Sequence, residues 1–225
     1  MTLHPAAGPV LLVTGFGAFA HYADNPSGAI ARAVDGASVD GTRVVGRVLE
    51  VCWHGAWPAV LAAVDELAPV GLLCLGVCPD PFFRLELMAK NWAAPLADAR
   101  GALPPADGWM RIAPDGPAAY WTGLPVDVLA ERMEGRRARL QARDPGTAYA
   151  AARPWPDAGA YLCNHVFFRA MHHLGGRVPH RGFVHVSPGA EPGTGAPTRH
   201  EVLSAGGYLV GEFARWLARS SAGGG

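Results

Sequence analysis

The sequence predicts an α/β fold, namely a three-layer α/β/α sandwich with a mostly parallel, twisted central sheet. The chain contains two short apolar runs, Val10–Thr14 and Val70–Gly76. The first is followed by a glycine and the second ends in one, and such short apolar runs are typical of strands buried on both faces of a parallel sheet. Helical segments alternate with these runs and with a strand at residues 43–51, which indicates helices packed on both sides of a sheet. The 225 residues can bury a substantial core, so we expect a single domain over residues 1–219, followed by a disordered tail over residues 220–225.

The predicted elements alternate along the chain. They are strands over residues 10–14, 43–51, 70–76, 82–91 and 180–186, and helices over residues 26–34, 57–67, 126–133, 163–174 and 201–219. Asn25 and Pro26 account for the start of the first helix, because Asn is a preferred N-cap residue and Pro is tolerated in the first helical turn. Ligands of parallel sheets bind beyond the carboxyl ends of the strands, so the loops after Thr14 and Gly76 are the first places to look for a site.

The loop after the first strand formally matches a dinucleotide-binding fingerprint at residues 15–20. A phosphate-binding turn must lead directly into a helix, whereas the next helix start lies further on, at Asn25. The loop also carries Phe16 and Phe19, bulky groups where a pyrophosphate would need bare backbone. We interpret these two aromatic residues as walls of a small apolar pocket; the alternative is that they only pack the loop onto the sheet.

Residues 82–91 alternate between apolar and polar side chains, which is the period of a strand. This pattern puts Glu86 on a mixed face among apolar neighbours, where a carboxylate needs a partner. Arg84 or Lys90 can supply an ion pair locally, or Glu86 can orient a histidine from elsewhere in the chain. The local sequence favours the ion pair.

Two later segments are predicted to be irregular. Residues 92–119 are rich in Pro, Gly, Ala and Asp and form a long excursion that can include a hairpin, while the Pro- and Gly-containing residues 141–157 form a flexible flap. The helix at 126–133 can continue to Leu140. The arginines that it would place on a solvated face are Arg136, Arg137 and Arg139.

Cys163 stands at the predicted start of a helix whose apolar residues follow the helical spacing and which stops at Gly175 and Gly176. The N-terminus of a helix favours negative charge and so lowers the pKa of a thiol there. Cys163 is therefore a candidate nucleophile. The alternative is that it simply packs, because free cysteine is among the most buried residue types.

Charge and cysteine usage exclude several function classes. The chain has 19 basic and 19 acidic residues, so no general field attracts nucleic acid or an acidic membrane surface, and a small neutral ligand fits better. Its four cysteines include no CxxC pair, and the N-terminus lacks the pattern of a secretory signal. No apolar run approaches the ~20 residues that span a bilayer. We expect a reduced, cytoplasmic protein.

Glu86, Cys163 and His185 supply the parts of a nucleophile, base and orienter triad, each on or beside the carboxyl end of a predicted element. Spacing alone does not show that the three meet. A histidine inside an apolar strand, such as His185, is more often a structural residue than a catalyst.

The segment "DAGAYLCN", which contains Cys163, resembles the active-site cysteine motif of the pyroglutamyl peptidase I family, also called pyrrolidone-carboxylate peptidases. Further segments resemble family motifs in the same order along most of the chain. They are "LLVTGFGAF", "NPS", "FRLELMAKN", "ADAR", "DGPAAYWTGLPVDVL" and "GFVHVS". The most specific of all these motifs are those around Cys163 and "DGPAAY".

The resemblance implies a cysteine exopeptidase that removes an N-terminal 5-oxoproline from peptides through a thioester, without metal or cofactor. It implies that Cys163 is the nucleophile, that His185 acts as general base and then acid, and that Glu86 orients His185. It also implies assembly as a homo-oligomer, either a dimer or a tetramer.

Three further residues take substrate-binding roles by the same resemblance. Phe16 and Phe19 match the aromatics that hold the pyrrolidone ring, and Arg100 of "ADAR" would lie close to the nucleophile and stabilise an oxyanion. A neutral lactam fits apolar walls, whereas a peptide with a free charged amine would have to bury that charge. Around Glu86 the chain departs from the family, with Arg84 where Ser or Thr is usual and a changed preceding loop.

These departures leave other functions open. One is a related cysteine hydrolase that accepts another small cyclic or amidated group, and another is a catalytically silent lactam-binding or scaffold protein. A zinc site is a further hypothesis, although its residues lack the usual structural-zinc spacing. Its ligands would come from Cys163, His165, His172 and His173.

Overall fold

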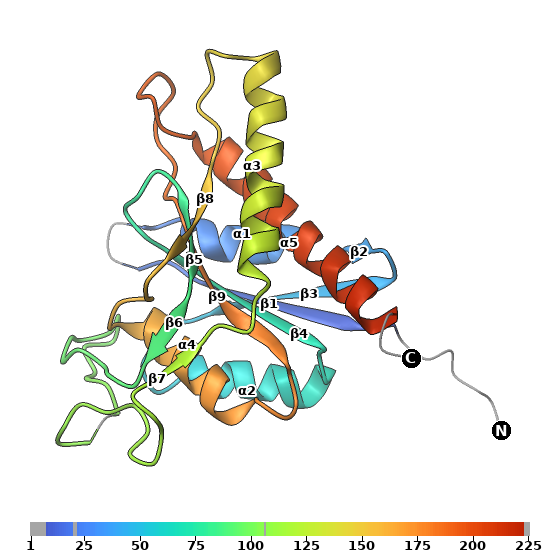
Figure 1. Ribbon diagram of the computed structural model, residues 1–225. Coiled ribbons are helices and arrows are strands. Elements are labelled where there is room, and N and C mark those ends of the chain that lie inside the picture. The colour runs from blue at the N-terminus through green and yellow to red at the C-terminus, as the bar shows by residue number, and fades with distance from the viewer. Residues whose placement is uncertain (1–7, 20–21, 106, 223–225) are drawn as a thin grey trace.

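A seven-stranded sheet forms the middle layer of the computed structural model, which describes residues 8–19, 22–105 and 107–222 (Figure 1). In spatial order its strands are β2 (Ser38–Val39), β3 (Thr42–Leu49), β1 (Val10–Phe16), β4 (Gly71–Val77), β9 (His180–Val186), β5 (Phe83–Glu86) and β8 (Ala152–Trp155). β6 (Met88–Lys90) and β7 (Ala119–Trp121) form a separate two-stranded sheet. The described helices are α1 (Pro26–Val34), α2 (Ala56–Leu67), α3 (Val126–Arg143), α4 (Leu162–His173) and α5 (Arg199–Ala222).

The sheet is mostly parallel, as predicted. Strands β3, β1, β4 and β9 run in one direction, β5 is antiparallel to β9, and β8 is parallel to β5. The last strand in the sequence, β9, lies between β4 and β5. It is therefore flanked by two strands that precede it in the chain by about a hundred residues.

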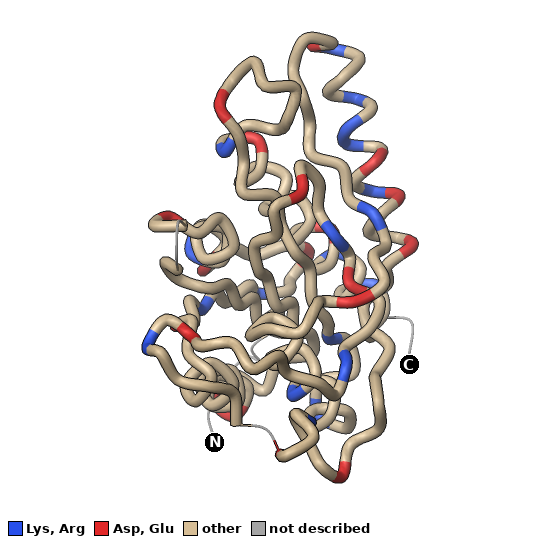
Figure 2. Tube along the Cα trace, turned by 90° about the vertical axis from the view of Figure 1, so that its left-hand side faces the viewer, with Lys and Arg blue, Asp and Glu red and all other residues tan. Residues whose placement is uncertain are grey.

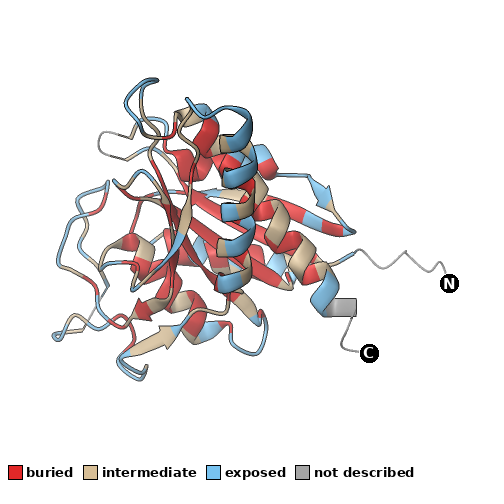
Figure 3. Ribbon diagram, turned by 45° about the horizontal axis from the view of Figure 1, so that its top comes forward, coloured by how far each residue is buried: buried red, intermediate tan, exposed pale blue. Residues whose placement is uncertain are grey.

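Helices cover both faces of the sheet. Figure 1 shows α1, α3 and α5 on one side and α2 and α4 on the other. The buried strand residues alternate between two cores: Leu12 and Leu72 pack on the α2 and α4 side, and Leu11 and Leu73 on the other. Buried residues line the strands between the helix layers (Figure 3). This three-layer arrangement confirms the predicted fold class.

Several predicted elements need correction. The strand predicted over residues 82–91 breaks at Leu87 into β5 and β6, which belong to different sheets. The N–H of Leu87 donates to Trp155 and its carbonyl accepts from Thr122, so the backbone turns from one sheet into the other. Residues 141–157 are not irregular throughout, since they include the edge strand β8. Helix α5 runs through Ala222, so the expected disordered tail is wrong for residues 220–222, and 223–225 lie outside the described residues.

Helix α3 extends to Arg143 and carries charged residues of both signs along its length (Figure 2), several of which form an exposed, solvated face. One of its arginines does not lie on this solvated face. Arg136 is buried, and its guanidinium donates to Glu201 Oε1 at 2.6 Å and Oε2 at 3.0 Å. It also donates to Ser204 Oγ at 3.0 Å, so it ties α3 to α5. The expected exposure of Arg136 is wrong because its partner is 65 residues away in the sequence.

Arg136→Ala is expected to lower the free energy of unfolding by about 3–5 kcal/mol, because it leaves the buried Glu201 carboxylate without its cation. Arg137→Ala is the matched control, since Arg137 pairs with Glu134 at the surface and such a pair contributes about 0–1 kcal/mol. Guanidinium unfolding followed by circular dichroism measures both. An equal decrease in the free energy of unfolding for the two variants would contradict the conclusion that the buried Arg136–Glu201 pair stabilises the fold.

Candidate active site

A small apolar cavity of about 130 Å³ lies beyond the carboxyl ends of β1 and β4. It is lined by Phe16, Phe19, Tyr22, Asn25, Val51, Val77, Tyr161, Leu162 and Cys163. An engineered apolar cavity of about 150 Å³ binds benzene, so a five-membered ring can fit here. The structure thus brings Phe16, Phe19 and Cys163 together around one cavity.

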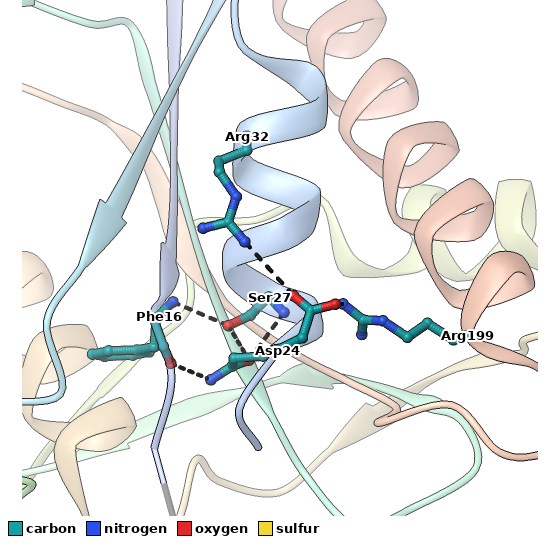
Figure 4. A network of polar contacts seen from close by, with 7 residues as sticks. Phe16, Asp24, Ser27, Arg32 and Arg199 are labelled. Carbon is teal, nitrogen blue, oxygen red and sulfur yellow. Dashed lines mark hydrogen bonds and ion pairs between the residues drawn. The ribbon is translucent and has the colours of Figure 1, made fainter.

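The loop that carries the two phenylalanines is anchored where it leaves β1 and where it enters α1. The Phe16 N–H donates to Ser27 Oγ at 3.0 Å, and Ser27 Oγ donates to Asn25 Oδ1 at 2.8 Å (Figure 4). Asp24 pairs with Arg199 of α5 and lies 3.8 Å from an Arg32 nitrogen (Figure 4). Asn25 also caps α1 as predicted, by accepting from the Ser27 N–H at 3.1 Å. These contacts fix the cavity wall to the scaffold.

Cys163 lies in the first turn of α4, as predicted. The N-cap residue is Tyr161, and no side chain caps this end of the helix. Tyr161 instead donates its hydroxyl to the Ala97 carbonyl at 2.9 Å, while its ring lies 5.7 Å from that of Phe19. The N–H groups of this first turn, in which Cys163 lies, thus have no capping side chain and can favour a negative charge that develops there.

Asn164, the next residue, holds the start of α4 against the end of β6. Its side chain accepts from the Lys90 N–H at 2.8 Å and donates to the carbonyls of Lys90 and Trp92 at 2.8 and 2.9 Å. Asn164 is fully buried. Asn164 was not among the predicted site residues, although its place as a polar residue among apolar neighbours was a signal for a buried role.

Gly76 of β4 lies next to both the Cys163 thiol and the strand position of His185. Gly76 is the register partner of His185 on the adjacent parallel strand. A Cβ atom built on Gly76 would lie 2.8 Å from Cys163 Sγ and 2.8 Å from Phe183 Cζ. The thiol thus occupies the space that a side chain at position 76 would fill. Since neighbouring strands are about 4.8 Å apart, the thiol lies beside the strand position that carries His185.

Gly76→Ala is expected to displace the Cys163 thiol and lower any Cys163-dependent activity by at least about tenfold, because misplacement by an ångström can cost far more. The matched control is Gly207→Ala in α5, where a Cβ has open space and alanine favours the helix. Steady-state kinetics and thermal unfolding of both variants provide the measurement. Full activity in Gly76→Ala would show that catalysis does not depend on the position of the Cys163 thiol over Gly76.

Glu86 and His185 form a buried pair. Glu86 Oε1 and His185 Nδ1 share a hydrogen bond of 2.7 Å, and Glu86 is fully buried. Among the described residues, Glu86 Oε2 has no hydrogen-bond partner. Arg84 and Lys90, the local candidates, pair with Asp80 and Asp157 instead. The geometry therefore favours the histidine partner over the local ion pair.

Burial dominates the electrostatics of these groups. It raises the pKa of Glu86 to about 9 and lowers the pKa of His185 to about 3, since both charged forms lose solvation. Burial, and then the charge of Glu86, also raise the pKa of the Cys163 thiol far above its ordinary value. The expected lowering by the helix N-terminus is thus wrong. A thiol whose pKa is raised needs a base to become a nucleophile.

Arg100 does not line the cavity. Its guanidinium lies at the surface, with 63% of the side chain exposed, and its Nε donates to Glu50 Oε1 at 2.6 Å. The residue of this segment that holds structure is Asp98, whose carboxylate accepts from the N–H groups of Trp53, Arg100 and Ala102. Asp98 was not predicted as a site residue, because its partners are backbone N–H groups, which leave no pattern in the sequence.

The residues of the zinc hypothesis point to separate partners. The His165 ring lies 5.4 Å from the Trp53 ring, His172 Nδ1 is 2.9 Å from the Tyr120 hydroxyl, and His173 stacks on Trp57. Within residues 8–19, 22–105 and 107–222, no group of three or more His, Cys, Asp or Glu side chains could hold a metal ion.

A cysteine at a helix N-terminus, a buried Glu–His pair beside it and an α/β/α sandwich around them are typical of cysteine hydrolases. A family model described as pyroglutamyl peptidase matches residues 10–191. The chain therefore belongs to the pyroglutamyl peptidase family.

Named relatives and solved structures agree with this assignment. The pyrrolidone-carboxylate peptidase of Pseudomonas fluorescens (strain SBW25) is 30% identical over 192 residues, which cover 83% of this chain and 82% of the relative. The one from Cupriavidus taiwanensis is 32% identical over 186 residues, covering 79% and 78%.

Among solved structures, a mutant pyrrolidone carboxyl peptidase from the hyperthermophile Pyrococcus furiosus has a TM-score of 0.77 and 26% identity, over 92% of this chain and 99% of that one. Pyroglutamyl peptidase I from Bacillus amyloliquefaciens has a TM-score of 0.77 over 92% and 97%, and at 24% identity it supports the fold alone.

Proposed function

We propose that the protein is a cysteine exopeptidase that hydrolyses the amide bond after an N-terminal pyroglutamyl residue of peptides. The observation that carries this proposal is that Cys163 forms part of the wall of a ring-sized apolar cavity and lies beside the buried Glu86–His185 pair. Family membership and the names of the relatives support the same substrate class.

The cavity suits a lactam ring because the described residues that line it are mostly apolar and include no charged side chain. A pyroglutamyl ring is neutral, whereas an ordinary N-terminal residue brings an ammonium group. Burying that charge without a partner would cost several kcal/mol. The site can therefore select the cyclised N-terminus over the free one by exclusion.

Catalysis would proceed through two acyl transfers. Nε2 of His185 takes the proton of the Cys163 thiol, and the thiolate attacks the pyroglutamyl carbonyl. N–H groups in the first turn of α4 bind the oxyanion. His185 returns the proton to the leaving amine as the C–N bond breaks and a thioester forms. Water, deprotonated by His185, then cleaves the thioester and regenerates the thiol.

Hydrolysis of a fluorogenic pyroglutamyl amide beside its prolyl counterpart tests the substrate. Turnover of the pyroglutamyl compound alone is expected, since the two differ in the lactam carbonyl and in the charge on the ring nitrogen. No turnover of either, in a folded protein whose Cys163 alkylates rapidly, would reject the substrate and favour a hydrolase of another small cyclic or amidated group. Tight binding of the pyroglutamyl compound without turnover would favour the silent binding protein.

The cellular setting and assembly are also proposals. A reducing, cytoplasmic compartment is supported by four free cysteines, one of them at the cavity. A homo-oligomer, dimer or tetramer, is proposed by resemblance to the family, and light scattering of the purified protein tests it. No helix within the described residues is long and apolar enough to cross a membrane.

A further inference from the structure

Arg84 lies directly across from His185 where β5 meets β9. Their Cα atoms are register partners in this antiparallel pair, so both side chains project from the same face of the sheet. Glu86, two residues further along β5, shares that face and bonds to His185. The positively charged Arg84 therefore lies on the same face of the sheet as Glu86 and His185, the two residues proposed to take part in proton transfer.

The guanidinium of Arg84 is held from two sides. It pairs with the carboxylate of Asp80, which comes from the loop after β4. Its central carbon also lies 4.3 Å from the centroid of the Trp155 ring on β8. Only 21% of the Arg84 side chain is exposed, so water and salt screen its charge less than that of a surface arginine.

Other charged and titratable groups also face the Glu86–His185 pair. Together with Arg84 they are Asp80, Lys90, Asp157, Cys78 and Cys163. Burial raises the pKa of Glu86, Arg84 and Lys90 oppose this rise, and Asp157 and Asp80 add to it. After burial, Arg84 also lowers the pKa of His185. Arg84 thus acts on both members in the same direction, toward loss of a proton from the pair.

Two protonation forms of the pair differ in what His185 can do. When Glu86 is protonated, its carboxyl group donates a hydrogen bond to Nδ1. The single proton of the neutral imidazole is then on Nε2, so Nε2 cannot accept the proton of the thiol. When Glu86 is ionised, Nδ1–H donates to the carboxylate and Nε2 is free to accept the thiol proton. Burial favours the first form, and a neighbouring cation favours the second.

We propose that Arg84 is a positioning residue, whose guanidinium favours the ionised form of the Glu86–His185 pair, in which Nε2 can accept the nucleophile's proton. Asp80 fixes this guanidinium in place and partly offsets its charge. The inference rests on the proposed peptidase function for its kinetic test and on the reactivity of Cys163 for an independent one.

Three variants separate the charge effect from a merely structural one. In Arg84→Met, the acid limb of the pH profile of kcat/KM for a pyroglutamyl amide is expected to move to higher pH by about one unit. In Asp80→Asn the limb moves to lower pH, because a negative charge near Glu86 is removed. Arg84→Lys keeps the charge and stays close to the wild-type profile. A loss of packing alone would not move the limb in opposite directions.

The pH dependence of Cys163 alkylation by iodoacetamide, followed by mass spectrometry of the Cys163 peptide, gives the second readout. Its midpoint is expected to shift with the same signs in the same variants. If the wild type does not cleave the pyroglutamyl amide, the proposed function fails while this readout still tests Arg84. Absent shifts, or shifts of the same sign in Arg84→Met and Asp80→Asn, would overturn the inference.

Discussion

Replacing Cys163 by alanine is expected to lower kcat/KM for a pyroglutamyl amide by at least about 10⁴-fold, because the acyl-enzyme can no longer form. The substitution removes only the sulfur atom that lies over Gly76, so the cavity and the Glu86–His185 pair should persist. Binding of the pyroglutamyl compound should therefore survive while hydrolysis is lost. Steady-state kinetics and equilibrium binding on the same preparation separate the two.

Cys52→Ala is the matched control, since Cys52 is also a free thiol but is buried and does not line the cavity. It should retain most of the activity and its sensitivity to iodoacetamide. Mass spectrometry of the wild type during turnover should detect the mass of the thioester at Cys163. An alanine variant at position 163 with wild-type activity would remove the nucleophile from the mechanism.

Glu86→Gln is expected to lower kcat by roughly 10³–10⁴-fold, although the glutamine side chain has nearly the same shape as that of glutamate. A glutamine amide can donate to Nδ1 of His185, which places the imidazole proton on Nε2, the atom that must accept the thiol proton. The variant also removes the carboxylate that would stabilise the imidazolium once it forms. Kinetics over a range of pH, with circular dichroism to confirm folding, provide the measurement.

Glu50→Gln serves as the control, because Glu50 pairs with Arg100 at the surface and should contribute little. Its result also tests Arg100, since a large loss would mean that this exposed pair takes part in catalysis. Near wild-type kcat in Glu86→Gln would show that His185 needs no carboxylate partner.

The local part of the fold was predictable from the sequence. Asn25 and Pro26 define the start of α1, and the apolar runs mark β1 and β4 to within two residues. The candidate triad was named from residue types, order and resemblance, and the hydrogen bond between Glu86 and His185 agrees with it. These features depend on neighbouring residues or on a motif that can be read directly.

Features that depend on distant partners were not predictable. The local sequence predicts that Arg136 is exposed, and only the tertiary structure shows that it pairs with Glu201. The break at Leu87 depends on backbone partners at Thr122 and Trp155. The raised pKa of Cys163 comes from burial, which outweighs the helix N-terminus from which the opposite shift was expected.

The position of β9 ties completion of the fold to assembly of the site. This strand is the last in the sequence, yet it fills the gap between β4 and β5. On the ribosome, β5 and β8 therefore have no place in the sheet until the segment around His185 has been synthesised. That closure is a long-range event, which topology makes slow. The same insertion brings His185 to Glu86, so a nascent or truncated chain without β9 would carry the thiol but not its base.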